Sequence, residues 1–403
     1  MIEKRKKENL EAGHWFCRHD LMLPGLVLLF YGYSLTFGFV WDDVREVTSD
    51  FERAFEKLKL HFRPIYYLTF AAMNQWVQAA WAHRLINILL LCTAAFLACR
   101  LAGRLQAPLG KWAVLAAFMH PTFVYPATWI SQRNDGFLLV FVFLTILNIH
   151  RNRGLGYLLL SDVSKTPFVL QNFWYAWRRW RLGGTLWPAW VAMAAVPLVV
   201  GQALLFWGEV RSEATSPMSM HVIDDFLDIG FVVAVRLAKL LEAWLLVHVP
   251  APAYLGVLSF WAIAAVALIQ AAAWAVIGVG VWRARRRWGA GGDLLLLALL
   301  MSLPFIANSN MRVLGPVIPF FYLGWVCLAG PGAWVKAALA VILVLNTTAS
   351  ALNYRVSDTG IFDVAQAPDY TLCGAHESKI PMENWRCNRS KVAAEIVRRF
   401  QSF

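Results

Sequence analysis

Two adjacent carboxylates stand where the first long apolar stretch of the sequence ends. Asp42 and Asp43 lie in FGFVWDDVRE, residues 37–46. A carboxylate within about 3 Å of a hydroxyl can take its proton as a general base. Adjacent residues point in different directions, so we expect one general base, with Asp42 slightly favoured, and one residue that orients it or binds a metal. With Glu46, the pair could bind one divalent cation or none.

Cationic side chains recur at the ends of other apolar stretches. They are Arg63 in HFRPIYY, Arg84 in HRLIN, Arg133 in ISQRND, Lys165 in SDVSKTP and Arg312 in NSNMRVLGP. Arginine and lysine bind phosphate through charge-assisted hydrogen bonds. If a lipid phosphate leaves while a hydroxyl is deprotonated, these cations would stabilise the charge that develops on the phosphate. Together, the acidic and basic residues predict transfer of a group from a lipid phosphate to a hydroxyl.

Composition places these residues in a polytopic membrane protein. Of the 403 residues, 59% are hydrophobic and only 15% are charged, whereas about 25% of the residues in an average soluble domain are charged. The 20 Trp agree with this class, because indole rings favour the headgroup level of a bilayer. The net charge of +12 lies largely in short loops between apolar runs. We therefore expect membrane lipids, and no nucleic acid, among the partners.

Basic clusters predict the orientation of the chain. The N-terminus, MIEKRKKENL, is strongly basic, and the apolar run after it exceeds the roughly 7–15 residues of a signal-peptide core. We expect an uncleaved first span, with the N-terminus in the cytoplasm. Basic turns and apolar runs then predict about eleven transmembrane helices. They lie near 21–40, 83–101, 112–128, 136–150, 154–163, 166–180, 186–207, 254–282, 293–307, 313–329 and 333–352.

These spans form one predicted transmembrane domain, residues 1–352, with two large outer loops at 41–82 and 208–253. The polar stretch SDFERAFEKLKLHF in the first loop has an amphipathic pattern, so we expect it to form a helix on the membrane surface. In the second loop, the charges of 226–248 would make a fully spanning helix costly, and we place this stretch in or near the outer interface.

The C-terminal tail, residues 353–403, is expected to be a small extracytoplasmic segment. It is too short for a large core and would need a covalent staple. In an oxidising compartment, a disulfide between Cys373 and Cys387 would close a loop of about 15 residues and stabilise the tail by roughly 3 kcal/mol. The alternative is two unpaired thiols.

Several short motifs follow one another in a recognisable order. They are the acidic pair that opens the first outer loop, RP with Asn ten residues on, HRLIN, HPTFVYPATWISQRND and a later SK. This order resembles the GT-C superfamily of integral membrane glycosyltransferases. The greatest similarity is to the transmembrane-and-TPR-repeat O-mannosyltransferases and their bacterial relatives. It covers roughly residues 35–180 and continues weakly through SLPFIANSNMRVLGPVIPF.

The resemblance implies a GT-C-like bundle and an enzyme that takes a sugar from a polyprenyl-phosphate donor, such as an undecaprenyl-phosphate sugar. It implies an active site on the outer, periplasmic face of a cell inner membrane. The acceptor could be a protein such as a pilin, a polysaccharide or a glycolipid. The residues do not indicate which sugar is transferred.

The resemblance also assigns roles by motif. Asp42 or Asp43 is the expected base, and the lipid phosphate would be bound by Arg133, Lys165 and Arg312. Further candidates at the site are Arg63, Arg84, His83, Asn87, His120 and Asp135. The sequence departs from the family pattern after Lys165, where Thr166 and Pro167 replace a Glu, and it has no TPR repeats. These departures leave the role of that Glu and the mode of acceptor recognition unassigned.

Structural roles are the alternative for each of these residues. The acidic pair could cap the following helix, and Arg133 could form a local ion pair with Asp135. Arg312 and Lys165 could extend to the lipid headgroups, and His120 could hydrogen-bond inside the bundle. For the whole chain, the alternative is a flippase or transporter of lipid-linked sugars, for which charged groups near the midplane and a pair of broken helices in symmetric halves would be expected. The two halves show no similarity and the ionisable cluster lies at one face, which favours the enzyme.

Overall fold

The computed structural model describes residues 18–37, 51–52, 54–55, 63–77, 79–165, 168–183, 185–197, 260–284, 289–307 and 311–358. Its α-helices are α2 (Arg18–Gly32), α5 (Pro64–Asn74), α6 (Ala80–Arg104), α7 (Gly110–Phe118), α8 (Val124–Thr128), α9 (Arg133–Leu147), α10 (Arg153–Ser164), α11 (Gln171–Arg181), α15 (Phe260–Ala284), α16 (Gly289–Ala307), α17 (Ile318–Ala329) and α18 (Ala333–Asp358). Short 3-10 helices are η1 (Tyr33–Thr36), η2 (Pro121–Phe123), η3 (Ile130–Gln132) and η5 (Met311–Val317). The described chain contains no β-strand, which agrees with the predicted all-α class.

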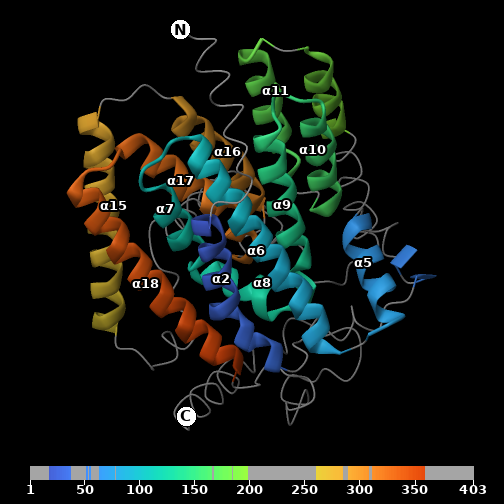
Figure 1. The fold of residues 1–403 in the computed structure, drawn as a ribbon, viewed down its shortest axis with the longest axis horizontal. Helices are drawn as coiled ribbons and strands as arrows, with labels where there is room; N and C mark the ends of the chain where they lie inside the picture. Colours follow the sequence, from blue (N-terminus) through green and yellow to red (C-terminus); the bar gives the residue numbers. More distant parts are fainter. Residues whose placement is uncertain are drawn as a thin grey trace, which may run out of the picture.

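The helices pack side by side in one bundle, with α15 and α18 at one edge and α9, α10 and α11 towards the other (Figure 1). Helices α6, α9 and α15 run from the lower end of this view to the upper end, whereas α10 and α18 run the opposite way. The lower half therefore contains the starts of α6 and α9, whereas α10 ends about halfway down this view. The upper end contains the ends of α6, α9, α11 and α15.

Four helices of the described chain are long and apolar enough to cross a membrane. They are Ala80–Arg104, Ile130–Leu147, Ala264–Ala284 and Ala333–Asn353. Shorter apolar helices lie at Leu21–Thr36, Gly289–Leu303 and Leu314–Ala329. These lengths are consistent with a membrane protein, but they do not confirm the predicted number of about eleven spans.

Close helix packing in the bundle depends on small residues. Helix α6 packs against α2, α7 and α9, and its alanines at 94, 95 and 98 are fully buried. A Cβ atom added to Gly136 of α9 would lie 2.8 Å from the Leu90 Cβ of α6. Similarly, a Cβ on Gly324 of α17 would lie 2.9 Å from the carbonyl oxygen of Gly291 in α16. Small residues at such crossings let backbones approach closely and gain van der Waals contact.

The predicted span near 112–128 is wrong as a continuous helix. Helix α7 ends at Phe118, and the chain passes through η2 before α8 begins. The cause is His120–Pro121: proline disfavours the helical conformation of the residue before it, and His120 has extended dihedral angles of −70° and 141°. The His120 Nδ1 atom then accepts a hydrogen bond from the Thr122 backbone N–H at 3.3 Å.

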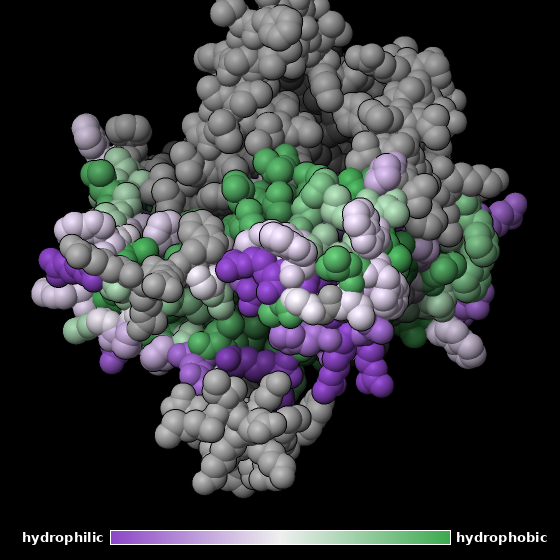
Figure 2. Space-filling model, turned by 90° about the horizontal axis from the view of Figure 1, so that it is seen from above, coloured by the Kyte–Doolittle hydropathy of each residue, from purple (hydrophilic) through white to green (hydrophobic). Residues whose placement is uncertain are grey.

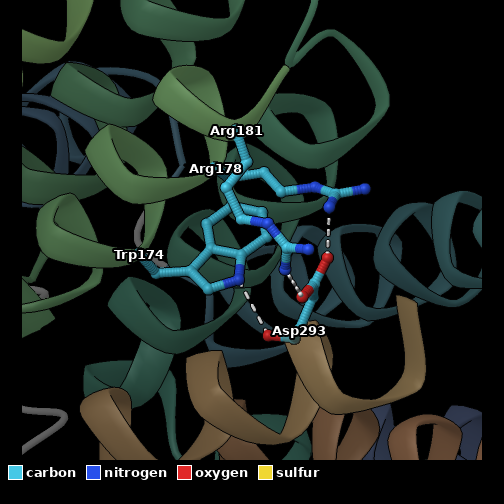
Figure 3. A network of polar contacts seen from close by, with 4 residues as sticks. All are labelled: Trp174, Arg178, Arg181 and Asp293. Carbon is cyan, nitrogen blue, oxygen red and sulfur yellow. Dashed lines mark hydrogen bonds and ion pairs between the residues drawn. The ribbon is translucent and has the colours of Figure 1, made fainter. Parts of the chain in front are cut away.

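The predicted short pair near 154–163 and 166–180 corresponds to α10 and α11. A polar network at the upper end fixes α11 on α16 (Figure 3). Trp174 donates its indole N–H to the backbone carbonyl of Asp293 at 2.8 Å. Arg178 and Arg181 approach the carboxylate of Asp293 at 2.5 and 3.9 Å.

Candidate functional site

Buried polar side chains from three neighbouring helices lie around the start of α9, in the lower half of the bundle. The start of α9 packs beside α6, and α10 packs along α9 (Figure 1). The predicted site residues in this region are His83, Arg84 and Asn87 of α6, Arg133 and Asp135 of α9, and Lys165, which follows α10. All are buried, with exposed fractions of 6% or less. We call these six residues the lower polar cluster.

Lys165 and Asp135 form a buried ion pair in this cluster. The Lys165 ammonium donates to the Asp135 carboxylate, and the two side chains are 7% and 2% exposed. Asp135 lies in the first turn of α9, where a carboxylate interacts favourably with the helix dipole. The Lys165 ammonium also lies 5.2 Å from the centre of the Phe168 ring. The pair joins the start of α9 to the end of α10 and holds an ammonium group inside the apolar bundle.

Arg133 is fully buried and joins α9 to α6 and α5. Its Nε donates to Asn87 Oδ1 at 3.1 Å, and its Nη2 lies 3.0 Å from His83 Nδ1. Because arginine can only donate, His83 Nδ1 accepts and the ring hydrogen is on Nε2. The guanidinium stacks 4.0 Å from the centre of the Phe70 ring and contacts the Met73 sulfur at 3.4 Å. These contacts hold the guanidinium plane in one orientation.

Arg84 and Asn87 connect the first turns of α6 to neighbouring backbone. Arg84 donates from Nε to the Thr128 carbonyl at 2.8 Å and from Nη1 to the Phe37 carbonyl. Asn87 Nδ2 lies 3.0 and 3.1 Å from the carbonyl oxygens of Pro126 and Trp129. Through these contacts, both side chains position the start of α6 against the neighbouring backbone.

Helix α5 lies within the predicted first outer loop and was missed by the sequence reasoning. It starts at Pro64, which suits the first helical position because its φ angle is preset and its missing N–H is not needed there. Tyr66 and Phe70, four residues apart, are buried. The spacing of these aromatic residues after Arg63–Pro64 was the available signal. Through Phe70, α5 covers the guanidinium of Arg133 and completes one wall of the cluster.

Two of the predicted site residues lie apart from the lower polar cluster in the contacts described. Arg63 directly precedes α5, and its Nε is buried. His120 lies at the break between α7 and η2, where its Nδ1 is 2.9 Å from Thr122 Oγ1 and its ring is edge-on to Tyr322. The contacts of His120 correspond to the predicted alternative of hydrogen bonding inside the bundle.

Several predictions fall outside the described residues. These are Asp42, Asp43, Cys373 and Cys387. The backbone of Arg312 lies in η5, which packs against α9 and η2, but its side chain is also outside the described part. Within the described ranges, no group of three His, Cys, Asp or Glu residues could hold a metal ion.

A second buried polar group lies next to the cluster and was not anticipated. Asp162, one turn before Lys165, accepts hydrogen bonds from Gln171 at 3.1 Å and Asn172 at 2.9 Å. Gln171 Nε2 also lies 2.5 Å from Ser161 Oγ. These bonds close the connection between α10 and α11 and so fix the position from which Lys165 reaches Asp135.

No protein-family model, curated protein or solved structure matches this chain. The residues of the lower polar cluster therefore provide the chemical evidence for a function. Among them, Arg84, Arg133 and Lys165 are cationic and Asp135 is anionic. Guanidinium and ammonium groups in a water-poor environment suit an anionic ligand such as a phosphate.

Proposed function

We propose that this protein is a glycosyltransferase that moves a sugar from a polyprenyl-phosphate donor to an acceptor hydroxyl at the lower end of the bundle. One observation carries the proposal. Residues predicted from separate motifs to serve one phosphate site are all buried around the start of α9, where Arg133 contacts His83 and Asn87 of α6 and Asp135 pairs with Lys165. A polyprenyl-phosphate donor supplies an anion at the depth of the lipid headgroups.

The proposed reaction needs a base and an anion site. Asp42 or Asp43 takes the proton of the acceptor hydroxyl, and the hydroxyl oxygen forms a bond to the anomeric carbon of the sugar. The bond between that carbon and the phosphate oxygen breaks, and the phosphate leaves with the electron pair. Cationic side chains stabilise the charge on the leaving phosphate. The lower end would then face the periplasm, across a cell inner membrane.

Lys165 is the described residue best suited to contact the phosphate. Its ammonium already binds a carboxylate oxygen of Asp135, and a phosphate oxygen offers the same acceptor chemistry. Arg133 has a different role, because its Nε and Nη2 atoms are directed at Asn87 and His83. We assign Arg133 the positioning of α5 and α6 around the donor, and keep Arg312 as a second phosphate contact.

Transfer can be tested with purified protein in lipid vesicles that contain polyprenyl-phosphate mannose or polyprenyl-phosphate glucose. The assay measures the release of free polyprenyl phosphate together with the labelled glycosylated acceptor. Asp42→Asn and Asp43→Asn, made separately, should identify one variant that has lost transfer. Full transfer by both variants would show that the base is wrongly assigned. A flippase would move the donor between leaflets without releasing polyprenyl phosphate, so the readout distinguishes the two function classes.

Donor binding can be measured separately with polyprenyl phosphate as the probe. A hydrogen bond to a charged group contributes about 1.5–3 kcal/mol, so Lys165→Met should weaken binding by roughly 10- to 150-fold. Arg312→Ala should also weaken it, and Lys165→Arg should restore part of the affinity. Lys336→Met is the control, because this exposed lysine lies in the first turn of α18 at the upper end. Equal affinity for the wild type, Lys165→Met, Arg133→Ala and Arg312→Ala would rule out the proposed phosphate site.

A further inference from the structure

The upper end of the bundle carries a large excess of cationic side chains. Those described there are Arg100, Arg104, Lys111, Arg151, Arg153, Arg178, Arg179, Arg181, Arg283 and Lys336. Asp293 is the one acidic residue whose side chain is described at this end, and it pairs with Arg178 and Arg181. Seen from above, hydrophilic residues, drawn in purple, gather on this face of the molecule (Figure 2).

Three helix ends bring several of these cations to one place. Arg104, at the end of α6, donates to the Leu147 carbonyl at the end of α9 at 2.5 Å. Arg179, in the last turn of α11, donates to the Ile149 carbonyl at 2.8 Å. His150 follows directly in the same turn. The contacts therefore converge on the turn between α9 and α10.

Like charges act on one another in this turn. Neighbouring groups remove part of the His150 ring from water, which lowers its pKa below the usual range, and the charges of Arg178, Arg179 and Arg104 lower it further. Arg104 in turn experiences the like charge of Arg151. Arg104, His150 and Arg151 are exposed at the surface, so a ligand from outside the protein can reach them. A bound phosphate would relieve the repulsion between these groups.

Exposed aromatic residues place this surface at the membrane interface. Trp180, between the arginines of α11, is 65% exposed. Trp187 and Trp190, which follow in the next helical segment, are 50% and 69% exposed. Tryptophan is enriched where a membrane meets water, at the level of the phospholipid headgroups.

We propose that Arg104, Arg151 and Arg178, around the turn at His150, bind the headgroup phosphate of an anionic phospholipid. Basic pockets between helices at one membrane face are suited to anionic headgroups, and each basic residue near such a surface contributes about 1 kcal/mol. A lipid is the ligand we infer, because the exposed Trp180 belongs to the same helix as Arg178, and Trp187 and Trp190 follow that helix in the chain. This site is at the opposite end from the lower polar cluster and does not depend on the glycosyltransferase proposal.

Native mass spectrometry can count lipids retained by the full chain after release from nanodiscs. The nanodiscs contain phosphatidylcholine alone or phosphatidylcholine with phosphatidylglycerol. The wild type should retain phosphatidylglycerol in preference to phosphatidylcholine. Arg151→Gln, whose side chain is exposed, should lower the retained fraction about fivefold, and adding Arg104→Gln should lower it about fivefold again. Lys336→Gln, at the same end but on α18, should leave retention unchanged.

The result would overturn the proposal if phosphatidylglycerol were not retained preferentially, or if Lys336→Gln lowered its retention as much as Arg151→Gln. The second outcome would mean that general positive charge attracts the lipid. Inorganic phosphate, added to phosphatidylcholine nanodiscs, separates the two sources of a phosphate group. Displacement of phosphatidylglycerol by inorganic phosphate at equal concentration would show a free-anion site and would also contradict the lipid assignment. Circular dichroism of each variant checks that its helices are retained.

Discussion

The buried ion pair between Lys165 and Asp135 should show strong energetic coupling. Removing one partner of a buried pair leaves the other charge uncompensated and typically destabilises a protein by about 3–5 kcal/mol. The Lys165 and Asp135 side chains are only 7% and 2% exposed, so water cannot replace the lost partner. We expect Lys165→Met and Asp135→Asn each to lower the free energy of unfolding by about 3–5 kcal/mol. The double variant should lose much less than the sum, because it buries no unpaired charge.

Unfolding in mixed micelles of decylmaltoside and SDS, followed by tryptophan fluorescence, measures these free energies. The four proteins of the double-mutant cycle give the coupling energy directly. Arg178→Gln tests a more exposed ion pair for contrast, because the Arg178 side chain is 28% exposed and Arg181 still faces Asp293. This variant should therefore lose less unfolding free energy than Lys165→Met. Additive losses at Lys165 and Asp135, within about 0.5 kcal/mol, would refute the assignment of a desolvated, coupled pair.

Three further changes probe packing, protonation and buried hydrogen bonds. Gly324→Ala should destabilise the protein by about 1–3 kcal/mol, because the new Cβ atom would lie 2.9 Å from a backbone oxygen. Gly103→Ala is the control and should be neutral or stabilising, because its new Cβ atom would have no neighbour within 4 Å. The pKa of His150 in the folded protein lies below the usual 6.5, so near that pH the unfolded chain binds more protons than the folded one. The free energy of unfolding should therefore fall as the pH drops below 6.5. His150→Gln should reduce this dependence on pH when unfolding is measured at several pH values. Arg84→Met should lower the unfolding free energy by roughly 1–3 kcal/mol for each buried carbonyl that loses its donor, and an unchanged value would show that water replaces the guanidinium.

The long apolar runs determined how much of the fold could be predicted. The prediction of 83–101 agrees well with α6, and 333–352 lies within α18, because length and apolarity alone identify such helices. The span near 112–128 failed because one His–Pro step outweighs an apolar run: proline removes a donor and redirects the residue before it. That signal was visible in the sequence, whereas the packing of α7 against α17 and α18 was not.

The candidate site was predicted in its members but not in their contacts. Helix ends with basic residues indicated Arg84, Arg133 and Lys165, and the structure buries all three, each with its own polar partners. Sequence reasoning could not tell which acceptors they meet, because the Thr128 carbonyl that binds Arg84 lies 44 residues away. Nor could it predict that Asp135 pairs with Lys165, since that contact depends on α10 returning along α9.

The contacts of Arg133 connect the helix that was missed to the residues that were predicted. Its Nη2 and Nε atoms are directed at α6, while its face and Nη1 contact Phe70 and Met73 of α5. A planar guanidinium can hydrogen-bond along its edge and stack on an aromatic ring at the same time, and an ammonium group cannot reproduce that geometry. The position of α5 is thus coupled to the start of α9, where Asp135 holds Lys165. A ligand that binds Lys165 would therefore act on a site whose walls are already held together by Arg133.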